Sequence, residues 1–416
     1  MKPEIKQRIE QLNNGKIPKG YKKTDFGVFP SDWVTDKKLI DIGTFGKGKG
    51  IPGNKMQSGG VPCVGYGDIY MKYNHFHFEE AQSFVDEETA KDSQLIKKGT
   101  LLFTGTGETA EEIGKCICYN GYSTICAGGD IITFVPQDVN PLFLAYQQYQ
   151  NFSLKKKASF GQGHSVVHIQ KKSLEKLNVA YPESKNEQSR IVEILMKWDK
   201  AIELYDKQID ALTRYKAVCL KKMFPIKGQS VPEWRFQGFS GDWEQRKAKE
   251  LCNIGTGKSN TQDQVEDGIY PFYIRSDIPV KSNKYLYDCE AVITIGDGNI
   301  GRVFHYVNGK FDLHQRCYKM TDFQDIWGKY FYYFFSTRFY DRAMKMTAKA
   351  TVDSVRLEMI SEMDIWKPTA IDEQKKIAKF FASLDNLITL HQRKKEVITN
   401  QRKTLQQYLL NGIIRV

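Results

Sequence analysis

A chain of 416 residues is long enough for two or three domains, each with a hydrophobic core of its own. Hydrophobic residues make up 41% of the chain and charged residues 26%, as in ordinary globular proteins, and no stretch is apolar enough to predict a membrane helix. The net charge of +12 favours a polyanionic partner such as DNA or RNA, although charge alone does not establish one.

Residues 1–24 are predicted to form a short helical segment ahead of the first domain. This segment lacks the apolar run of a secretory signal, so the protein is expected in the cytoplasm. The eight cysteines fit that compartment, because they include no C-x-x-C pair and are better explained as reduced, packed side chains than as zinc ligands. We therefore expect no metal site.

Residues 25–185 and 226–371 have the same mixed texture. Short β-rich runs, such as Ile131–Val135 and Ala291–Ile295, alternate with turns rich in Gly, Asn and Asp. Helical pieces intervene, for example at 327–336. The pattern predicts a globular α+β domain in each half of the chain.

Residues 186–225 and 372–416 are predicted to form two long helices. Each follows a proline and begins with a good N-cap residue, Asn186 or Asp372. Apolar residues then recur at 3-4 spacing, although His391 and Lys395 interrupt the second series. The length of each series favours two helices that pair with each other over roughly 50–60 Å. The predicted seam residues are Ile191, Leu195, Trp198 and Ile202 in the first helix, and Ile377, Phe381, Leu384 and Ile388 in the second.

The two halves of the chain are copies of one plan. Six short motifs recur in the same order, which chance does not explain. The matched pairs are Phe29–Trp33 with Phe239–Trp243, Lys38–Thr44 with Glu250–Thr256, Pro62–Ile69 with Pro271–Ile278, Leu101–Gly107 with Ala291–Gly298, Leu177–Pro182 with Met363–Pro368, and Asn186–Ile191 with Asp372–Ile377.

Three motifs resemble parts of enzyme signatures but are incomplete. Gly296–Gly301 fits G-x-G-x-x-G, yet a predicted strand and an Asn308-Gly309 turn follow where a dinucleotide site needs a helix. Gly255–Ser259 resembles the end of a P-loop without its first glycine. Asn140–Phe143 is similar to the tetrapeptide with which amino-methyltransferases hold a flipped base, but it lacks the second proline. No catalytic residues are predicted.

The order of motifs resembles the specificity subunits of type I restriction–modification enzymes, over nearly the whole chain. The most diagnostic pieces are the two Phe-x-x-Asp-Trp motifs and the two Glu-Gln-x-x-Ile helix openings, Glu187–Ile191 and Glu373–Ile377. The departures are mild: Ser240-Gly241 replaces Pro-Ser in the second copy, and the second seam carries its two polar residues.

This resemblance implies a non-catalytic subunit with two target-recognition domains, each reading one half of a split, asymmetric double-stranded DNA site. The long helices would pack as an antiparallel coiled coil that sets the distance between the half-sites. Two methyltransferase (M) subunits, which use S-adenosylmethionine, would bind along them. Restriction/translocase (R) subunits would add translocation and cleavage driven by ATP and Mg. No cofactor is expected in this chain itself.

Polar, Gly-punctuated loops are the candidate DNA-reading segments, with cations for phosphates and other polar side chains for base edges. Two other interpretations stay open: a coiled-coil adaptor between proteins, and a DNA-modifying enzyme with an unrecognised site. The candidate DNA-binding residues are Lys47, Lys49, Gln162 and His164 in the first domain, and Lys258, Asn260, Arg275, Lys349 and Thr351 in the second.

Overall fold

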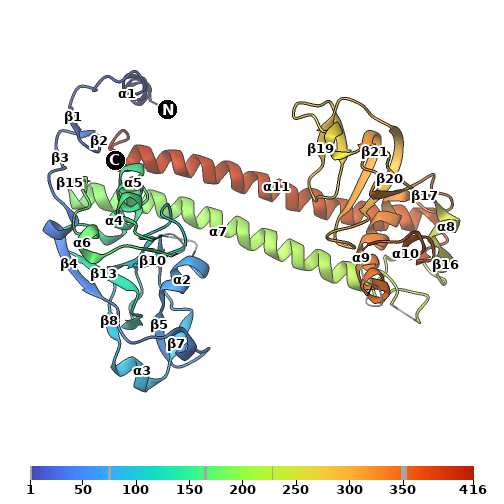
Figure 1. Ribbon diagram of the computed structural model, residues 1–416, viewed down its shortest axis with the longest axis horizontal. Helices are drawn as coiled ribbons and strands as arrows, with labels where there is room; N and C mark the ends of the chain where they lie inside the picture. Colours follow the sequence, from blue (N-terminus) through green and yellow to red (C-terminus); the bar gives the residue numbers. More distant parts are fainter. Residues whose placement is uncertain (1, 74–75, 164–165, 227, 348–353) are drawn as a thin grey trace. The chain divides into compact units, whose positions relative to one another are not determined.

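The computed structural model describes residues 2–73, 76–163, 166–226, 228–347 and 354–416. It forms two compact units, Met1–Leu204 with Lys395–Val416, and Tyr205–Lys394 (Figure 1). Each unit combines a sheet-containing globular part with portions of two long helices. Within the described residues, no helix is both long and apolar enough to cross a membrane.

The first unit is built on a five-stranded sheet in the order β4-β13-β9-β11-β6 and a four-stranded sheet in the order β7-β5-β12-β8. The central strand β9 is wholly buried, which agrees with its apolar sequence. The strands of the unit are β1 (Tyr21–Thr24), β2 (Gly27–Pro30), β3 (Trp33–Val34), β4 (Gly43–Lys47), β5 (Val61–Val64), β6 (His77–Phe78), β7 (Ser83–Val85), β8 (Gln94–Ile96), β9 (Thr100–Thr104), β10 (Thr106–Gly107), β11 (Cys116–Tyr119), β12 (Ile125–Ala127), β13 (Ile131–Pro136), β14 (Val167–His168) and β15 (Tyr181–Pro182).

Among the short helices of the first unit, α4 packs against strands β9 and β11. The best defined start is that of α4, where the Asn140 side chain accepts hydrogen bonds from the N–H groups of Leu142 and Phe143, and Pro141 occupies the first turn. The tetrapeptide at this position is therefore a helix cap. The helices are α1 (Pro3–Asn13), α2 (Tyr66–Met71), α3 (Glu87–Lys91), α4 (Pro141–Gln147), α5 (Asn151–Phe160) and α6 (Lys171–Leu174), with 3-10 turns η1 (Leu39–Ile42) and η2 (Gly53–Lys55).

The second unit has one six-stranded sheet in the order β17-β22-β20-β21-β18-β19, with the aromatic-rich helix α9 against β20 and β21 (Figure 1). Its strands are β16 (Glu244–Lys247), β17 (Asn253–Thr256), β18 (Tyr270–Tyr273), β19 (Val280–Ser282), β20 (Tyr287–Ile295), β21 (Phe304–Leu313), β22 (Cys317–Thr321) and β23 (Asp364–Lys367). Its helices are α8 (Ala248–Leu251), α9 (Gly328–Thr347) and α10 (Leu357–Ser361), with the 3-10 turn η3 (Thr261–Asp263).

The turn predicted at Asn308-Gly309 is wrong. Strand β21 continues through both residues, and Asn308 pairs with Glu290 while Gly309 pairs with Cys289 on β20. Gly309 has a φ of 129°, a value that a residue with a side chain rarely adopts, so the glycine is used within a long strand. The related prediction, that no helix follows Gly296–Gly301, is confirmed by the same strand.

The long helices are α7 (Lys185–Lys222) and α11 (Ile371–Leu410), against predicted ranges of 186–225 and 372–416. The N-cap assignments were wrong, because both residues lie inside their helices. At α7 the side chain of Ser184 accepts from the N–H of Glu187, and at α11 Asp372 is an acidic residue of the first turn.

The two helices run antiparallel, as the family resemblance implied. In the second unit, Tyr205 contacts His391 and Lys216 contacts Asp385, so residue numbers rise along one helix as they fall along the other. The ends of the predicted seam also enter the cores of the globular parts. Ile191 and Leu195 join the first core, Ile377, Phe381 and Leu384 join the second, and Trp198, Ile202 and Ile388 are half-buried.

Candidate functional site

Residues of two segments that were predicted to bind DNA come together in the second unit, Lys258 and Asn260 from one segment and Arg275 from the other. The side-chain oxygen of Asn260 accepts a hydrogen bond from Gln315 at 2.5 Å, and the backbone N–H of Gln315 donates to Ser259 at 2.8 Å. Arg275 reaches Asp297, which forms an isolated β-bridge with Ser354. We call this group of segments, residues 257–260, 275–276, 296–298, 314–316 and 354–355, the second loop cluster.

The centre of the second loop cluster is a carboxylate shared by two arginines. Arg275 donates from Nη1 to both oxygens of Asp297 at 3.2 Å, and Arg316 donates from Nη1 to Oδ2 at 2.7 Å. Burial of the Asp297 carboxyl opposes its ionisation, but the hydrogen bonds from Arg316 and Arg275 outweigh burial and lower its pKa. The carboxylate is therefore ionised at neutral pH and holds both guanidinium groups.

Two histidines adjoin this triad. Burial lowers the pKa of His305, whose Nε2 lies 3.2 Å from the carbonyl oxygen of Ser276. The pKa of His314 is also lowered, first by burial and then by the charge of Arg275. Both imidazoles are thus mainly neutral at pH 7, so the positive charge of this region comes from Arg275, Arg316 and the exposed Lys258.

The first unit contains a group of segments with the same backbone arrangement. We call this group, residues 48–50, 105–107, 128–130, 162 and 167–169, the first loop cluster. Lys49 donates its N–H to Ala127 as Lys258 does to Leu313, at 3.0 and 3.1 Å. In further matches of the same kind, Gly105 donates to Asp130 and Gly296 to Arg316, while Ile169 donates to Gly105 and Val355 to Gly296. Thr106 and Asp297 therefore occupy equivalent positions, as do Asp130 and Arg316.

The side chains at these equivalent positions differ. Thr106 lies 3.2 Å from Nδ1 of His168, whereas the second cluster has its Arg–Asp–Arg triad. The exposed Gln162 contacts His168 through two backbone hydrogen bonds of 2.8 and 3.0 Å. One scaffold thus displays two different sets of hydrogen-bonding groups, as expected for two readers of different sequences.

Glycines allow the chain segments of each cluster to approach closely. A Cβ atom on Gly48 would lie 1.7 Å from the carbonyl oxygen of Gly128, and one on Gly257 would lie 2.2 Å from that of Leu313. A Cβ atom on Gly296 would lie 2.6 Å from the carbonyl oxygen of Arg316. The Gly-rich motifs that resemble nucleotide signatures are therefore explained by backbone packing.

Of the nine residues predicted to bind DNA, five lie in the two loop clusters, one lies in a strand, and three lie outside the described residues. Lys49, Gln162, Lys258, Asn260 and Arg275 are exposed members of the two loop clusters. Lys47 is exposed but belongs to strand β4, where it pairs with Ile132, so it does not lie in a loop as expected. His164, Lys349 and Thr351 lie outside the described residues.

Sequence reasoning missed Asp297 and Arg316. Asp297 could have been found, because the match of Leu101–Gly107 with Ala291–Gly298 aligns a polar residue, Thr106, with it. Arg316 lies outside every matched motif, and only the fold brings it to Asp297.

The Glu-Gln pair at the start of each long helix has a structural role. Gln188 accepts from the N–H of Asn140 and donates to Pro182, and Gln374 accepts from the N–H of Trp327 and donates to Pro368, at 2.7–2.8 Å. In the neighbouring position, Glu187 binds Arg415 and Glu373 binds Arg235 through paired hydrogen bonds. Each pair fastens a long helix to a globular part.

A second set of contacts, an ion pair with a tyrosine hydrogen bond, recurs farther along the helices. Asp199 of α7 pairs with Arg402 of α11 and accepts a hydrogen bond from the hydroxyl of Tyr146 at 2.6 Å. In the second unit, Asp385 of α11 pairs with Lys216 of α7 and accepts from Tyr333 at 2.7 Å. These four helix residues are related by the same shift of 186 positions as the predicted seam.

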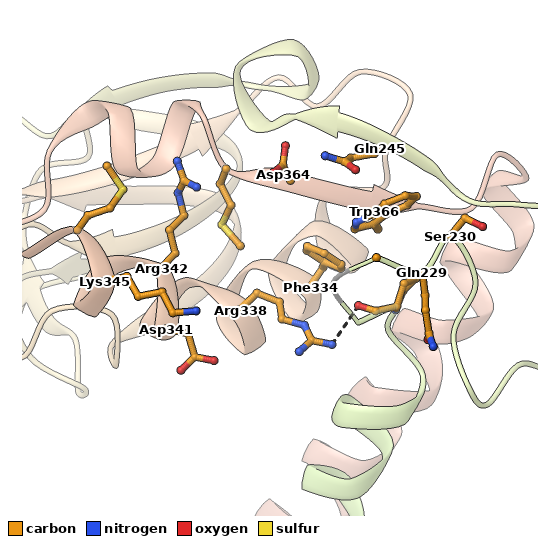
Figure 2. A pocket seen from close by; sticks show the side chains of 14 residues that line it. Gln229, Ser230, Gln245, Phe334, Arg338, Asp341, Arg342, Lys345, Asp364 and Trp366 are labelled. Carbon is orange, nitrogen blue, oxygen red and sulfur yellow. Dashed lines mark hydrogen bonds between the residues drawn. The ribbon is translucent and has the colours of Figure 1, made fainter.

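A cleft of about 780 Å³ opens in the second unit between α9, β23 and the segment after α7 (Figure 2). Arg338 and Arg342 of α9 line it, with Trp366 of β23. Arg338 donates to the carbonyl of Pro225 at 3.2 Å, and Arg342 donates to that of Met359 at 2.7 Å. Both arginines therefore hold backbone segments together. Across the described parts of the chain, no group of three or more His, Cys, Asp or Glu is arranged to hold a metal ion.

Two copies of one loop scaffold, carrying different polar side chains on a basic chain, define a modular DNA-reading protein. The sequence matches the profile of the type I restriction modification DNA specificity domain over residues 30–214 and 240–400, and the chain belongs to this family. It is a specificity subunit, the non-catalytic component that recognises the DNA sequence in a type I restriction–modification complex.

Curated relatives agree with this assignment, and a solved structure has a similar fold. The type I restriction enzyme MjaVIII specificity subunit of Methanocaldococcus jannaschii is 25% identical over 64% of this chain and 70% of its own. The putative MjaX specificity subunit of the same organism is 23% identical over 95% and 97%. The fold is similar to the crystal structure of the type I S subunit from M. genitalium, with a TM-score of 0.63 and 15% identity over 91% of this chain and 96% of that one.

Proposed function

We propose that each unit reads one half of a bipartite, asymmetric DNA site through its loop cluster. The observation that carries this proposal is the shared backbone of the two clusters, in which Thr106 and Asp130 stand where the second cluster has Asp297 and Arg316. A common scaffold gives both units the same way of approaching a groove. Different side chains give each unit a different base preference, so the complete site is asymmetric.

Affinity and specificity have different sources in this proposal. Exposed lysines such as Lys49 and Lys258 neutralise phosphates, which binds any sequence and weakens as salt is added. Side chains with paired donors or acceptors, such as Gln162, Asn260 and Arg316, contact base edges.

The partners are two methyltransferase (M) subunits and the restriction/translocase (R) subunits of a cytoplasmic complex. S-adenosylmethionine, ATP and Mg belong to those partners. Both long helices carry large apolar side chains that are exposed in this chain, a usual property of surfaces that another protein covers. These residues are Leu204, Tyr215 and Val218 on α7, and Leu387, Leu390 and Val397 on α11.

Methylome sequencing of the host with and without this gene tests the proposal, and domain exchange sharpens the test. Replacing residues 25–185 with the matching domain of a relative is expected to change one half-site and leave the other intact. Simultaneous change of both half-sites would contradict independent reading. No DNA binding, even with methyltransferase subunits present, would favour a protein–protein adaptor. Methyl transfer or cleavage by the isolated chain would instead identify it as an enzyme.

A further inference from the structure

The triad of Arg275, Asp297 and Arg316 has a geometry that non-specific binding to DNA would not require. Its interpretation rests on the proposed function. Each arginine gives only its Nη1 atom to the carboxylate. The Nε and Nη2 atoms of both side chains make no hydrogen bond to any residue that the structure describes. Because the guanidinium group is planar and rigid, these atoms form a free edge with two parallel N–H donors on each arginine.

The shared carboxylate is itself held in place. Asp297 is 21% exposed, the following Gly298 has a φ of 82°, and the bridge to Ser354 and the bond from Arg275 fix it from two sides. Arg316 is 62% exposed although its Nη1 atom is tethered to Asp297. A tethered guanidinium loses less conformational freedom when it binds than a free one does.

The Asp297 carboxylate also indicates which part of DNA the two arginines are suited to bind, a phosphate or a base edge. A site for phosphate would gain from two unopposed cations, whereas Asp297 halves the net charge of the pair from +2 to +1 and repels an approaching phosphate. A site for a base edge gains from orientation, because a bidentate contact requires the donor pair to meet two acceptors in one plane. The triad suits a base edge.

We infer that Arg316 reads a guanine in the half-site of the second unit, donating its Nε and Nη2 hydrogens to O6 and N7 in the major groove. Asp297 is the positioning residue for Arg316, and Arg275 fixes Asp297. The first unit has Thr106 and Asp130 at the equivalent positions, so this contact belongs to one half-site only.

The test uses the chain assembled with its methyltransferase subunits and duplex oligonucleotides carrying the wild-type methylation motif. Single base pairs of the second half-site are substituted in turn, and binding and methylation are measured for each duplex. For the wild-type complex, replacing one G·C pair is expected to weaken binding about 10- to 100-fold. Arg316→Lys keeps the charge but loses the paired donors, so discrimination at that pair should fall to a few-fold with an unchanged salt dependence.

Asp297→Asn should relax discrimination at the same base pair and leave binding to unrelated duplex DNA equal or tighter, because a negative charge is removed. A purely structural role would instead weaken binding to all sequences alike. Arg246→Lys is the matched control, since Arg246 is also held by two acidic residues but lies on β16, which pairs with β23 and is not part of the second loop cluster. It should leave the motif unchanged.

Specificity for the other half-site, measured on the same molecules, reports that each variant is folded and assembled. The inference is overturned if the second half-site contains no guanine that matters, or if Arg316→Lys and Asp297→Asn leave discrimination intact. A wild-type complex that methylates no bipartite site would refute the proposed function instead, so the two failures are distinguishable.

Discussion

Removing the cation of the Asp199–Arg402 ion pair should destabilise the first unit far more than removing the cation of its counterpart destabilises the second. Asp199 and Arg402 are 8% and 6% exposed, and the guanidinium group lies 4.3 Å from the ring centroid of Phe76. In the counterpart, Lys216 and Asp385 are 24% and 36% exposed. The two pairs occupy equivalent positions, so the chain contains its own control for the effect of burial.

Arg402→Met should lower the free energy of unfolding of the first unit by about 3–5 kcal/mol, because it leaves the buried Asp199 carboxylate without a cation. Lys216→Met should cost the second unit about 1 kcal/mol or less, because water screens the exposed pair. Adding Asp199→Leu to Arg402→Met should recover most of the loss, because no buried charge then remains unpaired.

Hydrogen exchange read by mass spectrometry measures this difference, because it reports the protection of each unit separately, as a global unfolding curve does not. A loss of about 4 kcal/mol corresponds to roughly a thousandfold faster exchange of the most protected amides in the first unit. Equal effects of the two methionine variants, or a loss below about 1 kcal/mol for Arg402→Met, would refute the reasoning.

Three further predictions follow from other features. Burial lowers the pKa of Lys157 to about 8, so between pH 8 and the ordinary pKa of 10.5 the unfolded chain binds more protons than the folded chain does. The free energy of unfolding of the wild type should therefore rise over that pH range. Lys157→Met should abolish this rise, as measured by urea titrations, and should stabilise the first unit at pH 7. Gly257→Ala should destabilise the second loop cluster by about 2 kcal/mol or more in thermal unfolding and lose the second half-site, whereas Gly53→Ala, with open space around it, should change neither. Inserting four residues near 205–209 adds roughly 6 Å of helix, so methylome sequencing should find the same half-sites one or two base pairs farther apart; an unchanged gap with full activity would show that the helices do not set the spacing.

The features that the sequence predicted well are those that depend on order along the chain. The duplicated motifs and the apolar seam through Ile191 and Leu195 led to the correct fold class and family, because repeats and helical periodicity are properties of neighbouring residues. The prediction of a turn at Asn308-Gly309 was wrong because it too depended only on neighbouring residues. An Asn-Gly pair usually marks a hairpin, and only the long pairing of β20 with β21 reveals that here it lies within a strand.

The side chains of the candidate site were harder to predict because they meet only after folding. Arg275, Asp297 and Arg316 come from three segments, and none of them has a local pattern that indicates its partners. The Glu-Gln motif was recognised as a family marker, yet its physical role could not be derived, because Glu187 binds a residue 228 positions away, Arg415. Distant ion pairs leave no periodicity in a sequence.

The first unit is built from two separate segments of the chain, and this affects the order in which the two units fold during synthesis. Leu409 and Leu410 belong to its core, and the carbonyl of Gly412 accepts a hydrogen bond from Tyr21. The second unit is one uninterrupted stretch, whereas the first needs Lys395–Val416, which are synthesised after all of the second. At roughly 5–20 residues per second, the first unit therefore waits about 10–40 s with part of its core uncovered. The half that is translated first is completed last, and a chain that stalls midway exposes that surface to chaperones and proteases.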